Sequence, residues 1–160
     1  IWGDMFLYRY ENYDPNNKYT CNAPSPEIQK YFLSRLSKKI IIADWQYHAM
    51  RYPIETCSTF LEAGFDCMLC PWDESNSNIS ATLETVKDRG LMGFMHTTWH
   101  TLTSGMPYVT MIALGGFNGS PIISKITART YTATILRKVM PAGGDYERAG
   151  WSKQQIDFKW

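Results

Sequence analysis

Four stretches of this chain share one pattern, an apolar run that ends in acidic, aromatic or histidine side chains. The clearest run covers residues 40–43 and is followed at once by Asp44, Trp45 and Tyr47. The other copies are residues 1–7, 65–73 and 91–100. Buried strands with functional groups at their carboxyl ends, alternating with helices, are typical of parallel α/β enzymes. This repetition constrains the fold more than any other feature.

Helical signals separate the four runs. Ser25 and Pro26 read as an N-cap followed by proline at the first helical position, and Ile28, Tyr31 and Phe32 then share one helical face. Three later helices are predicted over residues 53–63, 79–89 and 104–114. Strands that alternate with helices of this length predict a parallel sheet with right-handed crossovers.

The pattern favours a barrel over a dinucleotide-binding fold. No G-x-G-x-x-G motif follows any of the runs, whereas polar groups at strand ends fit a (β/α)8 barrel. We therefore predict an α/β fold in which residues 1–117 form the C-terminal half of a (β/α)8 TIM barrel, with four βα units. Residues 118–160 are predicted to be a helical or irregular extension that packs on the barrel.

A half barrel would leave its sheet edges open. The chain starts with Ile1 inside a predicted strand, so we expect it to be a piece of a longer polypeptide. Its partner is then expected to be either the preceding N-terminal half of the barrel or a second copy of the chain. Targeting signals would lie upstream, and the sequence indicates no compartment.

Charge and hydropathy exclude several classes of protein. The net charge is +1, with acidic and basic residues interspersed, which gives no electrostatic basis for binding nucleic acid. No apolar stretch reaches the length of a membrane span. Cys67 and Cys70 form a C-x-x-C, but alternation along a strand would point them to opposite faces. We predict buried thiols there, with no metal site and no cofactor.

The side chains at the strand ends are those that recognise sugars. A sugar ring presents apolar C–H faces flanked by hydroxyl groups, so sugar sites pair aromatic rings with carboxylates. The predicted substrate-binding residues are Asp4, Asp44, Trp45, Tyr47, Trp72, Asp73 and Trp99. The competing interpretation is that the tryptophans plug the end of the core, with each indole N–H bonded to a loop.

Three short motifs resemble the catalytic barrel of family 20 glycoside hydrolases, particularly its hexosaminidase-D-like branch. They are Trp2-Gly3-Asp4-Met5, Asp44-Trp45-Gln46-Tyr47 and Thr97-Thr98-Trp99. The resemblance implies cleavage of terminal β-linked N-acetylhexosamine from glycans, in which the substrate's own acetamido group attacks. It also implies that the catalytic acid and its neighbouring Asp lie upstream of Ile1, so no catalytic residue is assigned. Thr101 stands where many members of the family carry a Glu.

Two other functions remain open from the sequence. The segment could be a non-catalytic carbohydrate-binding or scaffold module whose aromatic residues serve adhesion only. It could also belong to a different barrel glycosidase in which Asp4 and Asp44 are themselves the catalytic acids.

Overall fold

The computed structural model describes most of the chain and divides it into two units, Ile1–Thr97 and Thr98–Trp160. The residues described are 1–72, 75–99, 102–118 and 124–139. Each unit is considered by itself below.

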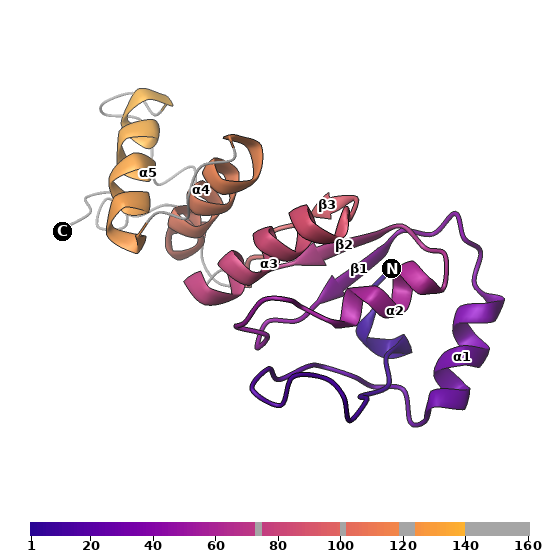
Figure 1. Ribbon diagram of the computed structural model, residues 1–160. Helices are drawn as coiled ribbons and strands as arrows, with labels where there is room; N and C mark the ends of the chain where they lie inside the picture. The colour runs from indigo at the N-terminus through magenta and orange to yellow at the C-terminus, as the bar shows by residue number, and fades with distance from the viewer. Residues whose placement is uncertain (73–74, 100–101, 119–123, 140–160) are drawn as a thin grey trace. The chain divides into compact units, whose positions relative to one another are not determined.

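The first unit contains a parallel sheet of three strands (Figure 1). In sheet order these are β1 (Ile42–Trp45), β2 (Cys67–Cys70) and β3 (Gly93–Phe94). Ile42 is paired with Cys67 and Trp45 with Cys70, so β1 and β2 end level with each other. The predicted α/β class and the parallel order of these strands are confirmed.

The predicted half barrel with four βα units is wrong, because the sheet is open and has three strands within the described residues. Residues 1–7 make one parallel bridge, from Trp2 to Ala43, and then turn into the 3-10 helix η1 (Asp4–Phe6). The amide of Phe6 bonds back to the Gly3 carbonyl at 2.9 Å rather than to a neighbouring strand. This segment is apolar because its end enters the core from a turn, where Leu7 is fully buried.

Besides η1, the described residues of the first unit form three α-helices: α1 (Pro26–Arg35), α2 (Thr56–Glu62) and α3 (Asn76–Arg89). The predicted cap of α1 is confirmed, since the Ser25 side chain accepts a hydrogen bond from the Ile28 amide. The helix buries Gln29 and Leu33, however, and leaves its more apolar face at Ile28, Tyr31 and Phe32 substantially exposed. Helix α3 ends at Gly90, whose positive φ of 60° closes the helix in the left-handed conformation that glycine favours.

The hydrophobic core lies on one face of this sheet. Ile42, Cys67 and Leu69 join Cys57 and Phe60 of α2 in the buried cluster. Ala43, Trp45 and Met68, which alternate with them along the strands, are not part of that cluster. The two faces of β1 therefore differ, one being sealed by helices and the other carrying the indole of Trp45.

The second unit contains α4 (Leu102–Asn118) and α5 (Lys125–Val139). The two helices pack against each other, and a hydrogen bond of 2.7 Å joins the buried hydroxyl groups of Thr110 and Thr132. Met111 and Ala128 are fully buried. Residues 140–160, which include the aromatic tail of the predicted extension, lie outside the described residues. Among the helices that are described, none has the length and apolar character needed to cross a membrane.

Candidate functional site

Three aromatic side chains meet at the carboxyl ends of β1 and β2, and we call Trp45, Tyr47 and Trp72 the aromatic edge cluster. The rings of Trp45 and Tyr47 lie 4.9 Å apart between centroids, tilted by 48°. Tyr47 is stacked on Trp72 at 5.8 Å with an angle of 22° between the planes. All three side chains are partly exposed. The alternation of the strands and the level ends of β1 and β2 produce this arrangement.

The orientation of Trp45 is fixed by Asp4. The indole Nε1 donates a hydrogen bond of 2.7 Å to Asp4 Oδ1, and Asn22 Nδ2 donates one of 2.7 Å to Asp4 Oδ2. Asp4 itself is only 5% exposed. A hydrogen bond between a neutral donor and a carboxylate is stronger than one between neutral groups. The indole plane is therefore held in one position before any ligand arrives.

Tyr47 is fixed at its hydroxyl end. Thr97 Oγ1 is hydrogen-bonded to the Tyr47 hydroxyl at 2.7 Å and to the carbonyl oxygen of Pro71 at 2.9 Å. Thr97 is also paired with Trp72 through a parallel β-bridge. These contacts tie the end of the first unit to the aromatic edge cluster.

Asp44 lies on the other side of the strand from Trp45, inside the core. It is fully buried, with Oδ1 accepting from Gln46 Nε2 at 2.8 Å and Oδ2 from Thr56 Oγ1 at 2.6 Å. Burial raises the pKa of this carboxyl from 3.8 to about 6, while its bonds to Thr56 and Gln46 act in the opposite direction. Both carboxylate oxygens thus accept hydrogen bonds from the protein. Through its bond to Gln46 Nε2, Asp44 holds the Gln46 side chain in position.

Gln46 connects Asp44 to the long loop before α1. Its Oε1 accepts from the Thr20 amide at 2.7 Å, and its Nε2 lies 3.2 Å from the Thr20 carbonyl oxygen. The same loop supplies Asn22 to Asp4. The sequence analysis missed both Thr20 and Asn22. The signal that could have found them is the length of the loop over residues 8–24, which has no helical or strand periodicity, because long loops are often functional.

The structure thus gathers four of the seven predicted sugar-binding residues at one edge of the sheet: Asp4, Trp45, Tyr47 and Trp72. Asp44 is adjacent to them in sequence but buried on the opposite face. Asp73 lies outside the described residues. Trp99 belongs to the second unit, where its side chain is 66% exposed.

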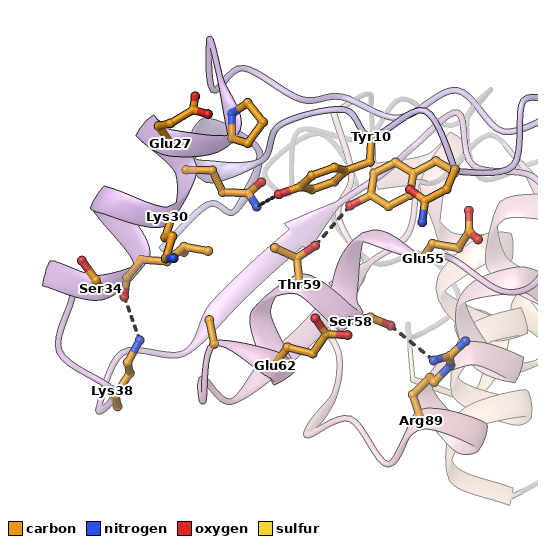
Figure 2. Close-up of a pocket in the computed structure, with 16 residues that line it drawn as sticks. Tyr10, Glu27, Lys30, Ser34, Lys38, Glu55, Ser58, Thr59, Glu62 and Arg89 are labelled. Carbon is orange, nitrogen blue, oxygen red and sulfur yellow. Dashed lines mark hydrogen bonds between the residues drawn. The ribbon is translucent and has the colours of Figure 1, made fainter.

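A separate groove opens between α1, α2 and residues 10–13, with a volume of about 970 Å³ (Figure 2). Its charged lining residues balance each other: Lys30, Lys38, Arg89, Glu27, Glu55 and Glu62. Several polar groups in it are bonded to one another, including the Tyr10 hydroxyl, which accepts from Gln29 Nε2 at 2.8 Å, and the hydroxyl groups of Tyr13 and Thr59 at 3.1 Å. The aromatic residues of the groove, Tyr10 and Tyr13, meet edge to face at 78° rather than stacked, and their hydroxyl groups are bonded to protein groups. Because its charges also balance, the groove is the weaker candidate for ligand binding.

Redox and metal chemistry have little support in the described residues. Cys67 and Cys70 are buried thiols without a disulfide, as predicted. Burial raises the pKa of the Cys70 thiol to about 12, which disfavours the reactive thiolate. Within the residues described, no three His, Cys, Asp or Glu side chains come together in a way that would hold a metal ion.

Comparison with known protein families, curated proteins and solved structures gives no match for this chain.

Proposed function

We propose that the aromatic edge cluster binds a terminal N-acetylhexosamine of a glycan and that the chain contributes this binding site to a glycoside hydrolase. The observation that carries the proposal is the convergence of Trp45, Tyr47 and Trp72, with the indole of Trp45 held by Asp4 at 2.7 Å. Sites for small molecules combine aromatic surface with a few convergent polar groups.

Fixed rings suit a sugar better than mobile ones. Ordering a side chain on binding costs about 0.5–1.5 kcal/mol. Trp45 avoids much of that cost because its indole is already bonded to Asp4. Asp4 is 5% exposed and both of its carboxylate oxygens accept a hydrogen bond from the protein, so its part is to hold the indole of Trp45 beside the side chain of Asn22.

The resemblance to family 20 glycoside hydrolases supplies the sugar and the reaction. It motivates a β-N-acetylhexosaminidase activity in which the acetamido group of the substrate attacks and the protein orients it. The residues that match the motifs would bind and orient the sugar, while the acid that protonates the leaving group lies outside them. Asp44 would position Gln46 and the loop at Thr20 rather than touch the sugar.

The experiment is a calorimetric titration of N-acetylglucosamine and N-acetylgalactosamine into the unmodified chain and into Trp72→Ala. We expect the variant to bind about tenfold more weakly, a loss of about 1.4 kcal/mol. Glu62→Ala, which changes the separate groove, is the matched control and should bind like the unmodified chain. Unchanged affinity in Trp72→Ala, or lost affinity in Glu62→Ala, would contradict the proposal.

A second assay separates this proposal from the alternative in which Asp4 and Asp44 are the catalytic acids of a glycosidase. Release of nitrophenol from 4-nitrophenyl N-acetyl-β-glucosaminide reports cleavage directly. If Asp4 and Asp44 were catalytic acids, the chain would cleave this substrate and Asp44→Asn would abolish cleavage. We expect binding without such Asp44-dependent cleavage, because both Asp44 oxygens are bonded inside the core.

A further inference from the structure

One buried amide joins the two chain segments that carry the stacked rings. Asn78, in the first turn of α3, is 1% exposed. Its Nδ2 donates to the carbonyl oxygens of Gln46 and Ala49, both at 2.8 Å. Its Oδ1 accepts from the backbone amide of Trp72 at 2.9 Å.

These three bonds span the aromatic edge cluster. Gln46 and Ala49 flank the segment that carries Tyr47, while the third bond holds the backbone of Trp72 itself. A carboxamide is the group that supplies two donors and an acceptor from one planar end. Asn78 is itself held, because its backbone amide donates to the Ser75 cap of α3 at 3.2 Å.

We propose that Asn78 is a positioning residue that sets the stack of Tyr47 on Trp72 and thereby the sugar platform. This inference rests on the proposed function for its effect on sugar affinity. Its structural part, that one side chain fixes the relative position of the two rings, stands independently of what the cluster binds.

Asn17, in the loop before α1, offers a matched comparison because it binds the same segment after β1. Its side chain is fully buried, its Nδ2 donates to the Arg51 carbonyl at 2.9 Å, and its Oδ1 accepts from the amides of Met50 and Arg51 at 2.9 and 3.0 Å. Asn17 therefore equals Asn78 in burial and in bonds to backbone. Asn17 binds Met50 and Arg51, which follow Tyr47 in the chain, whereas the backbone amide of Trp72 is bonded to Asn78.

The experiment compares Asn78→Ala with Asn17→Ala in the full chain. Both should unfold at lower urea concentration, since each leaves buried backbone groups without a bond. Only Asn78→Ala should move the indole resonance of Trp72 in a two-dimensional NMR spectrum, because that resonance senses the ring current of Tyr47. Only Asn78→Ala should weaken N-acetylglucosamine binding, by about tenfold, which corresponds to about 1.4 kcal/mol.

Equal effects of the two variants on the Trp72 resonance would show that Asn78 is merely structural and would overturn the proposal. So would an unchanged Trp72 resonance in Asn78→Ala. If the unmodified chain bound no N-acetylhexosamine, the proposed function would fail, yet the resonance would still decide the positioning role.

Should Asn78→Ala fail to fold, the unmodified chain gives the decisive measurement. The Nδ2 protons of Asn78 should exchange with solvent as slowly as the backbone amides of β2. Exchange at the rate of the exposed side chain of Asn12 would overturn the proposal.

Discussion

Replacing Asp44 by asparagine should stabilise the chain at neutral pH. Asp44 is fully buried, and burial raises the pKa of its carboxyl from 3.8 to about 6. A shift of one pKa unit corresponds to about 1.4 kcal/mol, so ionising the buried carboxyl costs the folded state about 3 kcal/mol. Asparagine keeps the shape and removes the charge. Its Oδ1 can still accept from Gln46 Nε2, and its Nδ2 can donate to Thr56 once that hydroxyl rotates.

The direction in which stability changes with pH follows from the number of protons that the folded and unfolded chains bind. Between pH 3.8 and about pH 6 the folded state retains a proton that the unfolded state has released. The free energy of unfolding of the unmodified chain therefore falls as pH rises through this window, by the contribution of this group. Above about pH 6 the full cost is present, and the advantage of Asp44→Asn should reach about 3 kcal/mol.

Urea unfolding of both chains from about pH 4 to about pH 8 measures this difference directly. Taking the difference between variant and unmodified chain removes the contributions of distant carboxylates such as Asp14 and Glu27, whose pKa values are lowered by local hydrogen bonds. A difference that is independent of pH, or that is largest at low pH, would show that ionising Asp44 does not destabilise the folded chain.

Three further predictions concern stability and reactivity. Gly3→Ala should lower the free energy of unfolding by about 1–3 kcal/mol, because a Cβ there would lie 2.9 Å from Ile42 Cγ2 and from Phe60 Cζ. Urea unfolding measures this change, and an unchanged midpoint would contradict it. Trp99→Ala should change stability by less than about 0.5 kcal/mol, as expected for an exposed side chain, and a large drop in the melting temperature would show that the ring is packed. A thiol reagent at neutral pH should label partly exposed Cys21 before buried Cys57, as peptide mass spectrometry would show, whereas the reverse order would contradict the burial of Cys57.

The sequence predicted the parts of the fold that depend on local pattern. Ser25 before Pro26 located the start of α1, and the β-branched run at residues 40–43 located β1. It did not predict that residues 1–7 would leave the sheet after one bridge. An apolar run has the same composition whether its side chains enter the core from a strand or, like Leu7, from a turn.

The candidate site was predictable in its aromatic members but not in its buried connections. Asp44 and Trp45 are consecutive residues of β1, so alternation alone places them on opposite faces, and the core hydrogen bonds of Asp44 follow from that. Asn78 lies 31 residues beyond Tyr47 and has no motif around it. Its role depends on the crossover that brings the start of α3 against the loop after β1, which a sequence pattern does not specify.

Binding of an N-acetylhexosamine to the aromatic edge cluster can be observed at the tryptophan side chains themselves. The most direct test is to titrate N-acetylglucosamine into the nitrogen-15-labelled chain and follow the indole resonances of its tryptophans. We expect saturable shifts of the Trp45 and Trp72 indole signals, with little change in the backbone amide signals of Thr59 and Glu62 in the separate groove. Indole signals that do not move at saturating sugar, or shifts confined to the groove, would contradict it.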